Sequence, residues 1–109
     1  MGLDIRLTRR KKIVCPKCGE IVGHNDVYSV SSCGRAWYPI LESIGYYVPH
    51  EQRTEENDWY GKDMVLTNKQ AKEVYMFVQN KDVYDGLEAA GLISTAIYEN
   101  DDIVINADW

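Results

Sequence analysis

The sequence lacks the features that mark membrane, fibrous or disulfide-stabilised proteins. No run approaches the roughly 18 consecutive apolar residues of a membrane span, and the N-terminus carries no apolar signal core. The cysteine count is odd, at three, and only three prolines are present. A composition of 45% apolar and 27% charged residues over 109 residues instead predicts one globular domain, residues 1–109. We expect it in the reducing cytoplasm.

Several catalytic motifs are absent as well. No glycine-rich phosphate loop follows a predicted strand and no His-Glu-x-x-His helix exists, so nucleotide-dependent enzymes and zinc proteases are not expected. Asp101 and Asp102 fall in a predicted turn, where turn chemistry alone favours aspartate. A thiol-dependent hydrolase is an alternative, because a cysteine, a histidine and an acid form a nucleophilic triad. The residues for such a triad are Cys33, His24 or His50, and Asp26 or Glu51.

Charge is distributed unevenly along the chain. Residues 1–36 carry a net charge of +4 and the remaining residues −9, within a total of −5. The basic run Arg9, Arg10, Lys11 and Lys12 supports two interpretations. It is a phosphate contact for nucleic acid, or it is a solvated hairpin turn between two strands. We favour the turn, because the acidic remainder of the chain would repel a polyanion.

Cys15-Pro16-Lys17-Cys18-Gly19 is the most specific motif in the chain. Two cysteines this close are poor material for a structural disulfide, but their turn presents two thiolates to one metal ion. Structural zinc takes four ligands, and the motif supplies half of them. We therefore predict a zinc site in which Cys33 and His24 complete the set. The alternative is a plain turn without metal, with Cys33 a small buried residue at the start of a helix.

The pattern of apolar residues predicts an α+β fold: a small antiparallel sheet with the CxxC knuckle, about three short helices and a C-terminal β-hairpin. Strands are predicted at 3–7, 12–15, 20–22 and 27–30 within a basic region, residues 1–34. Ser31 and Ser32 are candidate N-caps for a helix that starts near residues 35–37 and ends at Gly45.

The second half of the chain, the acidic region 63–109, is predicted to be helical and to end in the hairpin. Met64-Val65-Leu66 is a short strand or a hydrophobic staple, and Thr67 with Gln70 forms a capping box for a helix to about residue 80. A second helix is predicted from 83 to 90, with Gly91 as its C′ residue. Segments 93–98 and 103–106 are predicted to pair as the hairpin.

Aromatic residues are dominated by rings with a polar group, eight tyrosines and three tryptophans against one phenylalanine. Four of them flank or occupy a long polar loop, residues 47–62, and these are Tyr46, Tyr47, Trp59 and Tyr60. Tyr and Trp are enriched at interface hot spots, so an exposed cluster here predicts a partner-binding site. The alternative is that the rings fold back onto the domain and fill the gap between two helices.

The first 47 residues resemble a group of small uncharacterised proteins of phages, prophages and other mobile elements. The resemblance is carried by Met1-Gly2-Leu3-Asp4-Ile5 at the start of a strand, by the Cys-Pro-x-Cys-Gly turn, and by a short helix that ends near Ile44-Gly45-Tyr46-Tyr47. That group commonly has a histidine-containing segment before the helix, where this chain has Ser31-Ser32-Cys33. The resemblance implies an accessory gene of a mobile element, acting in a bacterial cytoplasm.

Three functions are therefore compared. The leading hypothesis is a non-enzymatic protein-binding accessory protein, in which the acidic region and the Tyr/Trp loop engage a host or phage protein. The first alternative is a zinc-ribbon-like nucleic-acid-binding adaptor that uses the knuckle and the basic run. The second is the thiol-dependent hydrolase. No membrane partner is expected.

Overall fold

The computed structural model describes residues 3–81 and 83–108, which form a four-stranded sheet and three α-helices. The strands are β1 (Asp4–Val14), β2 (Ile21–Cys33), β3 (Met64–Val65) and β4 (Asp102–Asp108). The α-helices are α1 (Tyr38–Ser43), α2 (Asn68–Val78) and α3 (Gly86–Glu99), and the short 3-10 helices are η1 (Arg35–Trp37) and η2 (His50–Gln52). The sheet order is β2-β1-β4-β3 with antiparallel pairs throughout, which confirms the predicted α+β fold.

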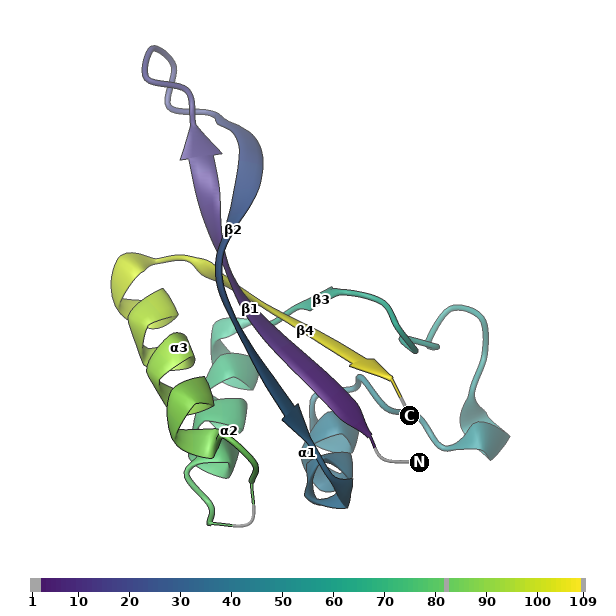
Figure 1. The fold of residues 1–109 in the computed structure, drawn as a ribbon. Helices are drawn as coiled ribbons and strands as arrows, with labels where there is room; N and C mark the ends of the chain where they lie inside the picture. Colours follow the sequence, from purple (N-terminus) through teal and green to yellow (C-terminus); the bar gives the residue numbers. More distant parts are fainter. Residues whose placement is uncertain (1–2, 82, 109) are drawn as a thin grey trace.

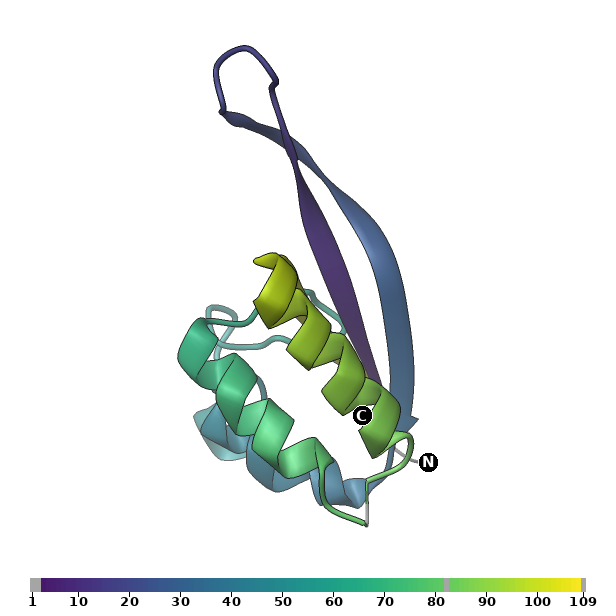
Figure 2. The same ribbon diagram turned by 90° about the vertical axis from the view of Figure 1, so that its left-hand side faces the viewer.

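The three α-helices lie on one face of the sheet, and the core fills the space between them (Figure 1, Figure 2). On β1, Ile5 and Leu7 face this core while Arg6 between them is exposed, as the alternation of a half-buried strand requires. The largest fully buried side chains are Trp37, Tyr46, Leu3, Leu7, Leu41, Ile93, Ile105, Val74 and Val78. Among the described residues, no helix is both long and apolar enough to span a bilayer.

The front third of the chain is one long ribbon rather than the short strands we predicted. β1 continues through the basic run to Val14, and β2 continues from Ile21 to Cys33. The predicted turn at residues 9–12 is therefore wrong, because those residues pair with β2, as in Lys12 opposite His24. A basic run has no intrinsic turn chemistry such as Gly or Asn, so strand pairing continues through it.

The outer part of this ribbon projects beyond the rest of the molecule (Figure 1). β4 pairs with β1 only as far as Arg10, opposite Asp102. Beyond that point β1 pairs with β2 alone, up to Ile13 opposite Gly23 and Val14 opposite Ile21. We call residues 11–25 the arm, and the turn at residues 15–20 its tip.

The first helical segment confirms its predicted bounds but not its predicted caps. It starts at η1 and ends before Gly45, whose φ of +81° is in the left-handed region that glycine tolerates. Neither Ser31 nor Ser32 is an N-cap, because Gly34 and Trp37 occupy the cap positions without side-chain bonds. Ser32 instead accepts a hydrogen bond from Trp37 Nε1 at 2.9 Å inside the core.

Helix α2 begins as the sequence predicts. Thr67 Oγ1 accepts from the Gln70 N–H at 3.2 Å, and Gln70 Oε1 accepts from the Thr67 N–H at 2.9 Å, which completes the capping box. Gln70 also donates through Nε2 to the Ile44 carbonyl at 2.9 Å. The cap therefore also ties α2 to the end of α1.

Helix α3 is longer than predicted and replaces one arm of the expected C-terminal hairpin. Gly91 lies inside it, and segment 93–98 forms its last turns. β4 is confirmed as a strand, but its partners are β1 and β3. The buried positions Ala89, Leu92, Ile93 and Ala96 show the reason, since their spacing of three and four residues is helical.

The predicted long loop, residues 47–62, contains one short 3-10 helix and is held by local hydrogen bonds. Arg53 donates from Nε and Nη2 to the Val48 carbonyl, at 3.1 and 3.0 Å. Asn57 Oδ1 accepts from the Thr54 N–H at 2.6 Å, and Thr54 Oγ1 accepts from the Asn57 N–H at 3.4 Å. These bonds give the loop a defined backbone path.

Candidate functional site

The Cys-Pro-Lys-Cys turn forms the tip of the arm. The Cys15 N–H donates to the Glu20 carbonyl at 2.8 Å, and the Gly19 N–H donates to the Cys15 carbonyl at 2.9 Å. Gly19 has a φ of +73°, a conformation that strains residues with a side chain. The two bonds close a tight turn with Cys15 and Cys18 on the same loop.

The Cys15 sulfur is the centre of a small hydrogen-bond set within this turn. Hydrogen bonding with the backbone of Cys18, with the Cys18 side chain and with the backbone of Lys17 lowers the pKa of the Cys15 thiol. A thiolate is the form of cysteine that binds metal and attacks disulfides. The tip can therefore offer two sulfurs to a thiophilic metal ion or to thiol exchange.

The structure does not bring the other two predicted zinc ligands, Cys33 and His24, to this pair. Cys33 is exposed and lies opposite Asp4, at the other end of the β1–β2 ribbon. The eleven residues of β1 separate the two ends by roughly 33 Å at about 3.3 Å per residue. His24 lies opposite Lys12, with Nε2 at 3.7 Å from Asp102 Oδ2. Within residues 3–81 and 83–108, no three potential metal ligands are close together.

An exposed apolar surface surrounds the tip. Four branched side chains are between 47% and 65% exposed, and we call them the apolar collar: Ile13, Val14, Ile21 and Val22. The register of the ribbon shifts between Ile13 and Val14, where Val22 is left without a pairing partner. Exposed apolar patches of this kind mark interaction sites on soluble proteins.

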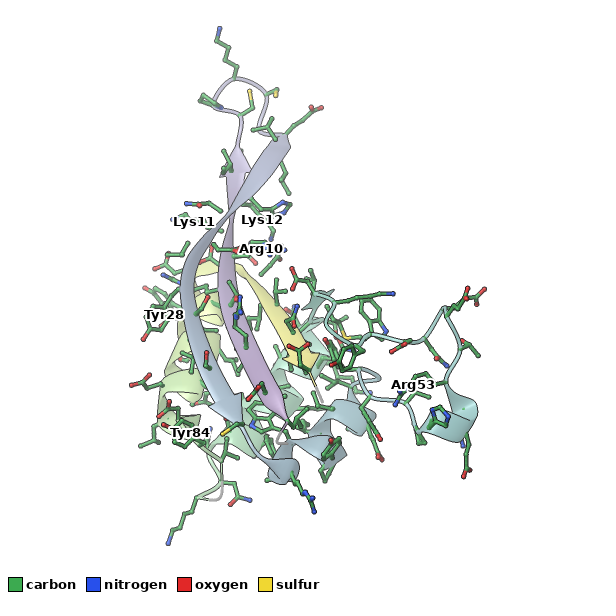
Figure 3. All side chains as sticks on the ribbon, turned by 45° about the vertical axis from the view of Figure 1, so that its right-hand side comes forward. Arg10, Lys11, Lys12, Tyr28, Arg53 and Tyr84 are labelled. Atoms are coloured by element: carbon green, nitrogen blue, oxygen red, sulfur yellow. The ribbon has the colours of Figure 1, made fainter. Side chains whose placement is uncertain are left out.

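The basic run lies at the root of the arm, where Figure 3 labels Arg10, Lys11 and Lys12. Most of its members form ion pairs with acids. Arg10 lies 2.8 Å from Asp26 and 3.5 Å from Asp63, and the hydrogen bond with Asp26 raises the pKa of Arg10. Lys12 Nζ lies 3.5 Å from Asp102 Oδ1. All three acids lie on the opposite strand or in distant parts of the sequence, so the sequence alone did not indicate these ion pairs.

Arg9 is paired on the other face of the ribbon. Its Nη1 lies 3.4 Å from Asp101 Oδ2, an ion-pair distance that lacks the geometry of a hydrogen bond. Lys11 is the one member of the run for which the described residues provide no ion pair. Cations that are already paired with acids neutralise fewer phosphates and displace fewer counterions from a nucleic acid, which weakens the support for the nucleic-acid interpretation of Arg9, Arg10, Lys11 and Lys12.

The predicted aromatic binding cluster is mostly folded back onto the domain. Tyr46 is fully buried, so its assignment as a partner-binding residue is wrong. Tyr47 and Trp59 are half-buried against the core, and the Trp59 ring centroid lies 6.3 Å from that of Tyr46. Tyr60 is the exposed member of the four. Burial is favoured because packing against the core removes the apolar surface of these rings from water.

Tyr46 has a structural role that its sequence context did not indicate. Its hydroxyl donates to the Lys62 carbonyl at 2.6 Å and accepts from the Ala107 N–H at 2.8 Å, which joins the long loop to β4. Burial is the main cause that raises the pKa of Tyr46 above its ordinary value of 10.0. The neutral phenol is thus favoured in the folded state.

Tyr46→Phe is expected to lower the free energy of unfolding at pH 7 by about 1–3 kcal/mol, because the Lys62 and Ala107 backbone groups lose their partner. The raised pKa adds a pH signature. Stability from this group is complete below pH 10, where both states are protonated, and is lost as pH rises through the folded pKa. Urea unfolding at several alkaline pH values should therefore show a steeper loss for the parent than for the variant. Equal slopes would contradict this role.

Cys33 lies in a different environment from the one a thiol hydrolase requires. The hollow beside it has a volume of about 330 Å³ and is lined by Asp4, Ser31, Ser32, Cys33, Tyr84 and Asp85. No histidine is among these lining residues, and His24 lies farther along β2, beside Asp102. The predicted pairing of Cys33 with His24 as nucleophile and base is therefore wrong.

Comparison of this chain with protein-family models, with curated proteins and with solved structures finds no match. The resemblance to mobile-element proteins stays a prediction. The candidate site therefore rests on geometry, and its main feature, the projection of the arm, was missed by sequence reasoning. A usable signal existed in the β-branched residues on both sides of the Cys-Pro-Lys-Cys turn, which favour one continuous hairpin.

Proposed function

We propose that this chain is a non-enzymatic binding protein, an accessory protein of a phage or mobile element, that engages another protein through the arm tip. The observation that carries the proposal is the apolar collar, four exposed branched side chains on a ribbon that projects from the domain. A partner that covers the collar would remove apolar surface from water, worth about 25 cal/mol per Å².

The arm is a two-stranded extension of the sheet, and this geometry supports the same proposal. A two-stranded ribbon with no third strand or helix against it is marginally stable in water. The ion pairs of Arg10 and Lys12 hold the root of the arm against the body, while Ile13, Val14 and the tip extend past them. An extension of this kind gains stability when a second surface packs on it.

Site-specific photocrosslinking in the cells that carry the gene tests this proposal. A benzoyl-phenylalanine replaces Val22, which is 65% exposed on the arm, and the matched control replaces Met76, which is 71% exposed on α2. We expect discrete crosslinked products from position 22 and none of these products from position 76. Ile21→Asp, placed beside the probe, should reduce the yield at position 22 because it interrupts the collar.

Two results would contradict the proposal. One is the absence of crosslinked products from position 22 with a folded protein, as judged by circular dichroism. The other is the same set of products from positions 22 and 76, since nonspecific contact would then explain them.

A further inference from the structure

We propose that the arm tip is one half of a four-thiolate zinc site, and that the tip of a second copy of this chain supplies the other half. The inference rests on the proposed function, because it names the partner that covers the apolar collar. Each copy contributes Cys15 and Cys18, and the two copies are related by a two-fold axis through the ion.

The number of ligands is the first argument. Structural zinc sites are closed by four N or S ligands, and the Cys-x-x-Cys spacing provides a pair for one ion. The described part of the chain adds no third ligand at the tip. Cys33 is at the far end of the ribbon, and His24 is beside Asp102. Arg53, which directly follows the helix η2 that contains His50, lies far from the tip (Figure 3). The missing pair must therefore come from another molecule.

The shape of the molecule is the second argument. The arm carries the tip clear of the helices in both views (Figure 1, Figure 2). The domain is elongated, with extents of 48 × 34 × 23 Å. Pairing with β4 stops at Arg10, so about four residues per strand, roughly 13 Å, separate the tip from the four-stranded sheet. Two tips can therefore meet while the domains stay apart.

The chemistry around the cysteines fits a shared ion. Four thiolates and one Zn²⁺ sum to a charge of −2, and one Lys17 from each tip offsets it. The Cys15 N–H donates to the Glu20 carbonyl and the Gly19 N–H donates to the Cys15 carbonyl, and these two bonds hold both cysteines in one tight turn. The apolar collars of two copies would meet around the ion and exclude water from it.

Native mass spectrometry and sedimentation of the reduced, full-length chain with Zn²⁺ test this proposal. We expect two chains per zinc ion and a doubling of the mass from 12.5 kDa, reversed by a chelator. Cys15→Ser and Cys18→Ser should each abolish zinc binding and leave a monomer. The matched control, Cys33→Ser, changes the same chemical group at the other end of the ribbon and should leave the dimer unchanged. Because the tip lies outside the core, circular dichroism should report the same fold for all three variants.

Substitution with Co²⁺ gives a second, independent measurement. A tetrahedral four-thiolate site should show sulfur-to-cobalt charge-transfer bands that saturate at half an equivalent of metal per chain. Saturation at one equivalent, one zinc per monomer, a dimer that persists without metal, or a zinc-bound dimer of Cys18→Ser would each overturn the proposal.

The photocrosslinking experiment separates this inference from the proposed function. With zinc, the purified chain carrying the probe at position 22 should crosslink to itself, at twice the mass of the chain. If the chain stays monomeric with zinc but crosslinks in cells to a protein of another mass, the zinc dimer is wrong and the proposed function stands. If neither experiment gives a product from position 22, both are wrong.

Discussion

Gly86→Ala is expected to lower the free energy of unfolding by about 3 kcal/mol or more. Gly86 is buried at the first turn of α3, against the end of α2. A Cβ at this position would lie 2.1 Å from the Val78 carbonyl oxygen and 3.3 Å from the Val83 Cβ. The first obstacle is backbone, so a rotamer change cannot relieve it and the two helices must move apart. Val78 and Val83 both belong to the core that this movement would open.

Gly91→Ala in the same helix is the matched control and should have the opposite sign. Nothing lies within 4 Å of a Cβ at position 91, and this residue is exposed in the helix interior. Alanine is favoured over glycine there by roughly 0.5–1 kcal/mol. Urea unfolding followed by far-UV circular dichroism measures both changes. If Gly91→Ala destabilises the protein, residue 91 ends a helix, as its sequence context predicts, and α3 does not continue through it.

The sequence predicted the elements whose local signals agree with their tertiary environment. Thr67 and Gln70 form a capping box through local hydrogen bonds that do not depend on tertiary packing. Gly45 ends α1 because glycine tolerates a positive φ. Segment 93–98 was misassigned because Ile93, Thr95 and Ile97 also suit a strand. The helical spacing of Ile93 with Ala89 becomes apparent only when residues 83–98 are treated as one segment. Gly91 within this segment instead suggests that a helix ends there.

The chemistry of the candidate site could be predicted from the sequence, but the distances between its residues in the fold could not. The pair of cysteines identifies the turn directly, and the structure places both on the tip. Cys33 was grouped with them because its distance along the sequence is short. The thirteen residues of β2 convert that short sequence distance into the length of the ribbon. The acids that neutralise the basic run depend on strand pairing and on the α3–β4 connection, which no local pattern encodes.

Trp37→Ala is expected to lower the free energy of unfolding by about 3–5 kcal/mol, a large part of the roughly 5–15 kcal/mol of a domain this size. The Trp37 side chain is 0% exposed and packs edge-to-face on Phe77, with ring centroids 5.0 Å apart. Thermal and urea unfolding by circular dichroism measure this change. A matched surface variant, Tyr98→Ala, removes a ring that is 87% exposed and should change stability by less than about 0.5 kcal/mol.

The polar end of Trp37 separates packing from hydrogen bonding within this effect. Nε1 donates to Ser32 Oγ at 2.9 Å, and Ser32 Oγ donates in turn to the Tyr84 carbonyl at 2.5 Å. Ser32→Ala leaves the buried Trp37 Nε1 and the part-buried Tyr84 carbonyl without this partner, at a cost of about 1–3 kcal/mol. Trp37→Phe removes the same first bond, so the double variant with Ser32→Ala should cost less than the sum of the single changes. Strict additivity would mean that the bond contributes nothing and that packing alone holds Trp37. In either case the zinc binding proposed for the tip should be the same in the folded variants as in the parent, because this network lies at the opposite end of β2 from Cys15 and Cys18.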